Sequence, residues 1–165
     1  MSVEDNKAIV RRFFDEVWNE GNREAIQELV DNDWLPRDPA LAHIQPRSGT
    51  TGISTFMEVY RSAFPDLKFT IQEIVTEGDI VVTRFEAQGT NSGEEIMISL
   101  LGNRNFTIAP TGRTVKTSGV SMSRVVISQR TDVVVRQIKD HSWYWHGIGL
   151  LEALAVIQLR ERVSR

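Results

Sequence analysis

The sequence predicts an α+β domain in which three helices precede a curved, mostly antiparallel sheet and a fourth helix follows it. Apolar residues recur with a helical period of about 3.6 through most of the N-terminal third of the chain. After Pro65 they alternate with polar residues instead, which is the period of a half-buried strand. Helices gathered at one face of an antiparallel sheet are typical of the α+β class. A curved sheet with helices on its concave face would leave a conical cavity between them.

The three N-terminal helices are marked by signals at their ends. The first begins with a capping box at residues 2–5 and ends before Gly21, because glycine readily adopts the left-handed conformation that ends a helix. Asn22 can cap the second helix, and a third helix begins near Thr51. The intervening segment 33–49 holds three of the five prolines, so we expect a loop with a short strand there.

The remainder of the chain is predicted to form strands and one last helix. Alternating residues on both sides of the polar turn at 77–79 indicate a hairpin. The elements predicted after it are a less regular stretch at 91–112, strands at about 113–127 and 132–145, and a helix at 147–162. Neither an internal repeat nor a linker interrupts this order, so residues 1–165 are expected to form a single domain.

Composition excludes several classes of function. The 165 residues carry a formal charge of -3 and show no basic stripe, which argues against a nucleic-acid partner. The absence of cysteine excludes disulfides, thiolate metal sites and a cysteine nucleophile. The charged N-terminal stretch lacks the apolar core of a signal peptide, and no apolar run approaches the roughly 18 residues of a membrane span. We therefore expect a cytoplasmic protein without a membrane partner.

Motifs for common cofactors and for hydrolytic catalysis are also absent. The chain contains no phosphate-binding G-x-x-x-x-G-K-[ST] loop, no dinucleotide-binding G-x-G-x-x-G, no H-E-x-x-H and no G-x-S-x-G. Its three histidines, at positions 43, 141 and 146, are poorly spaced for a compact metal site. The expectation is binding or chemistry without a metal or a cofactor.

Residues 141–151 read HSWYWHGIGLL and contain two of the three histidines and two of the four tryptophans. Alternation along a strand divides the first six residues between two faces, one with His141, Trp143 and Trp145 and the other with Ser142, Tyr144 and His146. Spacing alone favours the interpretation that the tryptophans belong to the core or to a dimer interface. The alternative is that His146, at the end of the strand, faces a cavity as a general acid–base near neutral pH.

Four stretches of the sequence match one protein family in order and cover most of the chain: NKAIVRRFFDEVWNEGN, AFPDLKFTIQEIVTEGDIVVTRF, PTGRTV and WHGIGLLEAL. In these stretches the sequence resembles the SnoaL-like polyketide cyclases, or ester cyclases, of the nuclear transport factor 2-like superfamily. The resemblance implies a cone-shaped sheet of the nuclear transport factor 2-like, or cystatin-like, type around the N-terminal helices, with a deep apolar pocket. It also implies a homodimer packed through the sheet, and a pocket aspartate that shuttles a proton during an aldol ring closure without metal or cofactor.

The sequence departs from the family pattern at the residues that would perform the chemistry. The family motif W-D-x-x-G-L-L places an aspartate after the tryptophan, whereas Trp145 is followed by His146. The family loop D-H-D-P corresponds to residues 36–39, which puts Arg37 in the place of the histidine. If this alignment is shifted by one residue, Asp38 faces inward instead. We hypothesise that His146 moves a proton and that Arg37 stabilises the oxyanion of an anionic or enolisable ligand.

The helical stripes and the last strand indicate which side chains line the pocket. The predicted lining residues are Phe14, Trp18, Phe56, Met57 and Tyr60 on the helices and His141, Trp143, Tyr144 and Trp145 on the strand, with Tyr144 nearer the pocket than Trp143. The long stretch 94–113 is expected to reshape the pocket mouth. The predicted function is a cofactor-independent enzyme that cyclises, isomerises or transfers a proton on an apolar or polycyclic carbonyl compound. The alternatives are a non-catalytic small-molecule binding protein and a protein-interaction module on the same fold.

Overall fold

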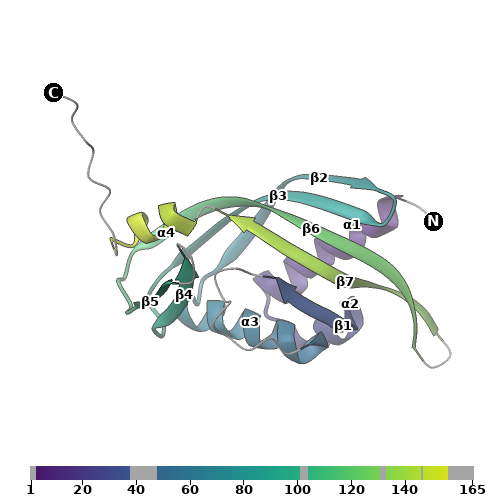
Figure 1. The fold of residues 1–165 in the computed structure, drawn as a ribbon, viewed down its shortest axis with the longest axis horizontal. Helices are drawn as coiled ribbons and strands as arrows, with labels where there is room; N and C mark the ends of the chain where they lie inside the picture. The colour runs from purple at the N-terminus through teal and green to yellow at the C-terminus, as the bar shows by residue number, and fades with distance from the viewer. Residues whose placement is uncertain (1–2, 38–47, 101–103, 131–132, 146, 156–165) are drawn as a thin grey trace.

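A computed structural model describes residues 3–37, 48–100, 104–130, 133–145 and 147–155 (Figure 1). In chain order the elements are helices α1 (Val3–Arg12), η1 (Phe13–Asn19, a π-helix) and α2 (Arg23–Leu29), strand β1 (Val30–Arg37), helix α3 (Gly49–Ala63), strands β2 (Lys68–Glu77), β3 (Ile80–Thr90), β4 (Ile96–Leu100), β5 (Arg104–Ile108), β6 (Thr114–Arg130) and β7 (Val133–Trp145), and helix α4 (Gly147–Ala153). Figure 1 shows α1, α2 and α3 on one side of a curved sheet. The predicted α+β class, with a curved sheet around N-terminal helices, is confirmed.

The first two helices end and begin at the predicted signals. Gly21 has a φ of 70°, the left-handed conformation expected of a residue that ends a helix. The Asn22 side chain caps α2, because its Oδ1 accepts hydrogen bonds from the backbone N–H groups of Glu24 (2.9 Å) and Ala25 (3.2 Å). The second half of the first helix is the π-helix η1, which the sequence pattern does not reveal. A π-helical turn holds more residues than an α-helical turn, and η1 buries Phe13, Phe14, Val17 and Trp18.

The segment between the second and third helices contains the expected strand. This strand, β1, pairs with β7 in parallel, with Arg37 opposite Ser142. Helix α3 begins at Gly49, slightly before the predicted start. Gly49 has a φ of 65°, and a Cβ atom there would lie 2.5 Å from the carbonyl oxygen of Asn32. The close approach of α3 to β1 therefore requires glycine at this position.

The five-stranded sheet has the order β1-β7-β6-β3-β2. β2 and β3 form the predicted hairpin, which turns at Gly78 with a φ of 59°. β3, β6 and β7 are antiparallel neighbours. The register shifts between Arg124 and Val125 in β6, and shifts again between Ile71 and Glu73 in β2. Irregularities of this kind bend a sheet and help it to curve around the helices.

Two apolar cores hold these elements together. The larger core lies between the N-terminal helices and the inner face of the sheet. The second joins the β4–β5 hairpin to α4 through Ile96, Ile98, Ile108, Leu150, Leu151 and Leu154. The stretch 91–112 therefore contains a regular hairpin with a buried face, which the sequence pattern did not predict. Helix α4 ends at Ala153, earlier than the helix predicted at 147–162, and Ala155 has a φ of 59°. Residues 156–162 lie outside the described part. No helix within the described ranges combines the length and apolarity of a membrane span.

Candidate functional site

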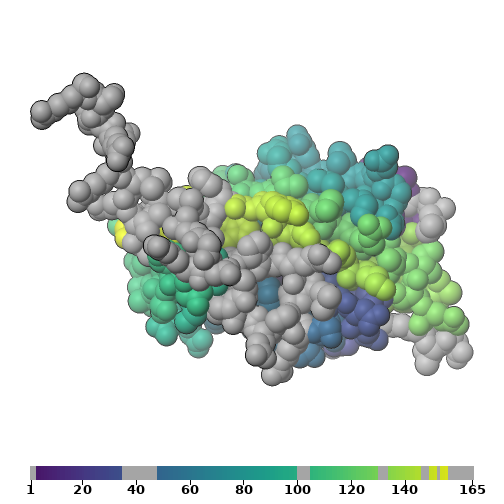
Figure 2. All heavy atoms as spheres, in the orientation of Figure 1, coloured from purple at the N-terminus to yellow at the C-terminus, as the bar shows by residue number. Residues whose placement is uncertain are grey.

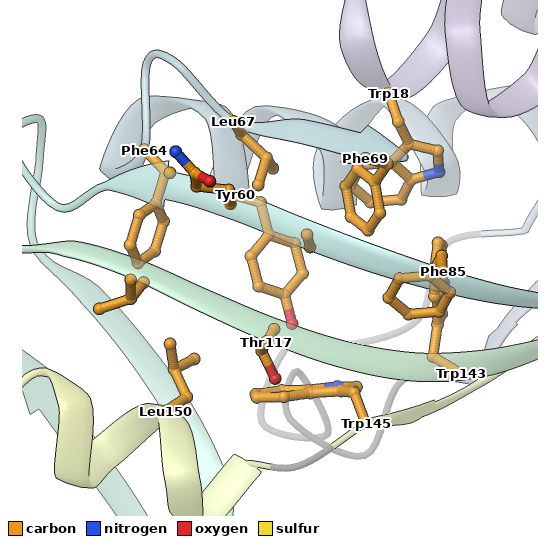
Figure 3. A pocket seen from close by; sticks show the side chains of 14 residues that line it. Trp18, Tyr60, Phe64, Leu67, Phe69, Phe85, Thr117, Trp143, Trp145 and Leu150 are labelled. Atoms are coloured by element: carbon orange, nitrogen blue, oxygen red, sulfur yellow. The ribbon is translucent and has the colours of Figure 1, made fainter. Parts of the chain in front are cut away.

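A cavity lies between the inner face of the sheet and helices η1, α3 and α4 (Figure 3). Its empty space, counted together with the open solvent at its mouth, is about 610 Å³. Its lining is almost entirely apolar and rich in aromatic rings. The lining residues are Trp18, Tyr60, Phe64, Leu67, Phe69, Phe85, Ala87, Gln88, Gly89, Val115, Thr117, Trp143, Trp145 and Leu150.

The strand register explains how lining residues distant in the sequence meet. Ala87 of β3 lies opposite Thr117 of β6. In the next row on the same face, Gly119 of β6 lies between Phe85 of β3 and Trp145 of β7. A Cβ atom on Gly119 would lie 2.7 Å from Cζ of Phe85, so glycine leaves the space that the Phe85 ring occupies.

Trp143 is the centre of the aromatic wall. Its ring centroid lies 5.1 Å from that of Phe85, 5.4 Å from that of Trp18 and 5.5 Å from those of Phe14 and Phe69. The contacts with Phe85 and Trp18 are close to perpendicular, the edge-to-face arrangement that aromatic pairs favour. These mutual contacts pack the rings against one another, so the wall offers an apolar, aromatic surface that is suited to flat, apolar rings.

Two hydroxyl groups give the cavity a polar contact point. Figure 3 shows the hydroxyl group of Tyr60, from α3, reaching toward that of Thr117, from β6, with the indole of Trp145 beside both. A hydroxyl group can donate and accept hydrogen bonds. This pair can therefore contact one oxygen atom of a ligand whose remaining surface is apolar.

Most of the predicted helical and strand positions are buried, but only some of them face the cavity. Its lining includes four predicted residues, Trp18, Tyr60, Trp143 and Trp145. Phe14 lies one layer behind, in contact with Trp143. Phe56 and Met57 are buried in the core, where the ring of Phe56 contacts that of Trp34, and they are not part of the lining.

The placement of Tyr144 near the pocket is wrong. Its side chain is 61% exposed, and it lies opposite Val120 on the outer face of the sheet. His141 and Trp143 are buried on the inner face instead. The expectation assumed that His146 faces the cavity and extended its alternation back to Tyr144, whereas His141, Trp143 and Trp145 lie on the inner face.

The two positions predicted to be catalytic are described only in part. β1 ends at Arg37, whose backbone lies opposite Ser142, but the Arg37 side chain lies outside the described part of the structure. Asp38 and His146 also fall outside the described residues. Trp145, which directly precedes His146 in the chain, lines the cavity.

His141 lies beneath the cavity wall rather than in the lining. Its ring centroid is 4.4 Å from that of Trp143, and its Nδ1 is 2.6 Å from Oγ of Ser123. Complete burial lowers the pKa of His141 to about 3, so its imidazole is neutral at physiological pH. Within the described ranges, no three histidine or acidic side chains are grouped so that they could hold a metal ion.

The part of the lining that comes from β2, β3 and β6 was not predicted from the sequence. Phe69 and Phe85 could have been predicted as lining residues, because each is the aromatic residue on the apolar face of an alternating strand. Thr117 could not have been, since its place in the cavity follows from the pairing of β6 with β3.

Comparison with known proteins establishes the family of this chain. A family model described as SnoaL-like polyketide cyclase matches residues 8–133. The chain belongs to the SnoaL-like polyketide cyclase family. Its aromatic cavity is therefore a feature of a SnoaL-like domain, as the resemblance of the four sequence stretches implied. No curated protein matches the chain at a significant level.

Solved structures similar to this SnoaL-like chain share its fold over nearly their whole length. Wild-type IdmH from Streptomyces antibioticus, described as "a putative polyketide cyclase", is 26% identical, with a TM-score of 0.67 over 91% of this chain and 98% of its own. A "putative polyketide cyclase" from Acidithiobacillus ferrooxidans is 24% identical, with a TM-score of 0.70 over 96% of this chain and 100% of its own. AclR from Streptomyces galilaeus, described as "a putative hydroxylase", is 23% identical, with a TM-score of 0.69 over 98% of this chain and 88% of its own. Because these descriptions differ, the fold alone does not define the reaction.

Proposed function

We propose that this SnoaL-like protein binds an apolar, ring-containing carbonyl compound in the aromatic cavity and catalyses a proton transfer on it without a metal or a cofactor. The observation that carries the proposal is the aromatic wall around Trp143, which lines an almost entirely apolar cavity. Burying the apolar surface of such a ligand contributes about 25 cal/mol per Å². Edge-to-face contacts with the wall favour flat rings over flexible chains.

In the proposed reaction, His146 removes a proton from the carbon atom next to the ligand's carbonyl group. Arg37 stabilises the negative charge that develops on the carbonyl oxygen. The resulting enolate either attacks a second carbonyl group of the same molecule, which closes a ring and leaves an alkoxide that takes the proton back from His146, or is reprotonated by His146 at another carbon atom, which isomerises the ligand. Histidine suits this role because its ordinary pKa, about 6.5, leaves the neutral base available near pH 7.

Two features of the chain support a position of these residues at the cavity. His146 is bonded to Trp145, a lining residue, and α4 begins directly after it and contributes Leu150 to the lining. β1 and β7 run parallel, with Arg37 opposite Ser142, so both strands end at the same edge of the sheet.

The proposal is tested with 1-tetralone, an apolar bicyclic ketone whose protons next to the carbonyl exchange in heavy water. The protein is expected to accelerate this exchange in a saturable manner, as followed by proton NMR. His146→Ala is expected to lower the rate by at least about 100-fold, the usual contribution of a general base, while tetralone still binds. Arg37→Ala is expected to slow exchange, and His146→Asp, which restores the family carboxylate, to retain part of it. Lys139→Ala, which removes an exposed cation from β7, is the matched control.

Tetralone that binds without faster exchange would overturn the catalytic part of the proposal. The second candidate function, a non-catalytic small-molecule binding protein, would then account for the cavity. The observation that favours this second candidate is the histidine at position 146, where the family motif has its aspartate.

We further propose that the outer face of the sheet forms a homodimer interface. Val120 and Met122 of β6 and Tyr144 of β7 are exposed apolar side chains on this face, and Val120 lies opposite Tyr144. Figure 2 shows β6 and β7 side by side at the surface. Exposed apolar patches on adjacent strands often mark interfaces, and a two-fold axis would place each patch against its copy. Sedimentation is expected to show a dimer that Val120→Glu dissociates, and a wild-type monomer would contradict the proposal.

A further inference from the structure

A group of buried polar side chains continues the inner face of the sheet beyond the cavity. Thr83 of β3, Ser121 and Ser123 of β6 and His141 of β7 are all fully buried. We name these four residues the inner polar patch. Polar side chains are costly to bury, and an apolar residue of similar size would pack at each position without that cost. The proposed proton transfer uses none of them.

The strand register places the inner polar patch directly next to the cavity wall. Trp143, which lines the cavity, lies opposite Ser121, and Ser121 lies opposite Thr83. In the next row on the same face, Ser123 lies opposite His141. Side chains opposite each other in a sheet are about 5 Å apart, and successive rows on one face are about 7 Å apart. The four side chains therefore form one continuous patch.

The hydrogen bonds of the patch are incomplete. His141 Nδ1 and Ser123 Oγ share the hydrogen bond described above. Among the described residues, no hydrogen-bond partner is present for Oγ1 of Thr83, Oγ of Ser121 or Nε2 of His141. Buried polar atoms in folded proteins are nearly always paired, and each unpaired one lowers stability. Three such atoms in two neighbouring rows indicate that the patch serves a partner from outside the chain.

Aromatic rings separate the patch from the cavity and from the helices. The ring of His141 contacts Trp143 at 4.4 Å, Phe13 at 5.1 Å and Phe14 at 6.3 Å between centroids. Phe13 and Phe14 begin the π-helix η1, and π-helical turns often accompany functional sites. Trp143 belongs both to the cavity wall and to the boundary of the patch. A ligand group that binds at the patch would therefore require the ring of Trp143 to move aside.

We propose that the inner polar patch binds a hydroxyl group at the end of the ligand that enters the cavity most deeply. This inference rests on the proposed binding of an apolar ring compound in the cavity. The hydroxyl groups of Thr83 and Ser121 can each donate to the ligand oxygen or accept from its proton. A ligand hydroxyl group would pair atoms that have no hydrogen-bond partner in the described part of the chain.

The chemistry of His141 favours a neutral hydroxyl group over other polar groups. If Ser123 donates to Nδ1, then Nε2 carries the proton and donates to the ligand oxygen. If Ser123 accepts instead, then Nε2 accepts from the ligand hydroxyl. A hydroxyl group satisfies both tautomers, whereas a carbonyl oxygen satisfies only the first. Burial keeps His141 uncharged by lowering its pKa to about 3, so the patch offers no positive charge for a carboxylate or a phenolate.

The test compares two probes that differ by one hydroxyl group, naphthalene and 2-naphthol. Their dissociation constants are measured by NMR titration for the wild-type protein, Thr83→Val and Ser121→Ala. The wild-type protein is expected to bind 2-naphthol about 5-fold more tightly than naphthalene, as one net hydrogen bond implies. Each variant is expected to lose most of this preference while its affinity for naphthalene changes less than about twofold. Ser99→Ala removes a buried hydroxyl group from β4, away from the patch, and is expected to keep the preference.

The variant Tyr60→Phe distinguishes binding at the inner polar patch from binding at the hydroxyl pair of Tyr60 and Thr117. It removes one hydroxyl group of that pair and leaves the patch unchanged. If the preference disappears in Tyr60→Phe and persists in Thr83→Val and Ser121→Ala, the inference is wrong. Variants of the patch that melt at lower temperature without ligand but keep the preference would show a purely structural role and would also overturn it. Equal binding of both probes by the wild-type protein would overturn the inference, but it would still support ligand binding in the apolar cavity. If neither probe binds, the proposed function fails and the inference fails with it.

Discussion

Acidification is expected to destabilise the wild-type protein more than a His141→Gln variant. His141 is completely buried against aromatic rings, and burial lowers its pKa to about 3. In the unfolded chain a histidine titrates near about 6.5. Between these two values the unfolded state binds a proton that the folded state does not bind, so the stability of the fold decreases as the pH falls through this window.

The size of this effect follows from the two pKa values. Each pH unit inside the window removes about 1.36 kcal/mol from the free energy of unfolding. Lowering the pH from about 7 to about 4.5 should therefore remove about 2.5 kcal/mol through His141 alone. Glu28 and Asp66, whose pKa values are lowered by hydrogen bonds from Arg12 and from Thr90, also lose stabilising interactions in acid. They do so equally in both proteins, so their contribution cancels in the comparison.

Urea denaturation of both proteins at the two pH values measures the prediction. The quantity compared is the loss of unfolding free energy on acidification, so a change in absolute stability caused by the substitution does not matter. The wild-type loss is expected to exceed the variant loss by about 2.5 kcal/mol. Equal losses would refute the reasoning, because they would mean that His141 takes up its proton without unfolding.

Three further substitutions test individual features of the fold by denaturation. Asn22→Ala removes the cap from α2 and is expected to cost about 1 kcal/mol, whereas Asn22→Ser should retain most of the stability. A Cβ atom at Gly93 would lie 1.8 Å from the carbonyl oxygen of Ser62, so Gly93→Ala is expected to cost about 2 kcal/mol or more, and an unchanged midpoint would contradict this close packing. Thr83→Val replaces a buried hydroxyl group that has no partner among the described residues. The ligand-free variant should therefore be as stable as the wild type or about 1 kcal/mol more stable. A clear loss of stability would show that the hydroxyl group is paired.

Features that depend on neighbouring residues could be predicted from the sequence. The cap at Asn22, the helix end at Gly21 and the hairpin turn at Gly78 each involve groups within one turn of the chain, and the structure contains all three. The order of helices and strands follows from the same local patterns. The wider turn of η1 is also local, but the apolar pairs of that stretch fit an α-helix and a π-helix equally well.

The site could be predicted only in part, because it is assembled by strand pairing. Trp145 lies opposite Gly119, and Thr117 lies opposite Ala87. The composition of the lining therefore depends on how the strands pair, and the sequence of one strand does not show its pairing register. Tyr144 shows the same limit, since alternation separates the two faces of β7 but does not say which face is buried. His141 was expected in the lining, yet it lies one row further along the sheet, beneath Trp143.

Binding of an apolar probe in the presence and absence of cavity-filling substitutions tests the ligand site most directly. Ala87 and Thr117 line the cavity from paired positions on the neighbouring strands β3 and β6, and phenylalanine at either position would occupy the space of the cavity. Naphthalene is expected to bind the wild-type protein saturably with one site per chain, and to bind neither Ala87→Phe nor Thr117→Phe while both variants keep a cooperative thermal transition. Equal binding by the wild-type protein and the filled variants, or no binding by the wild-type protein, would contradict the assignment of the aromatic cavity as the ligand site.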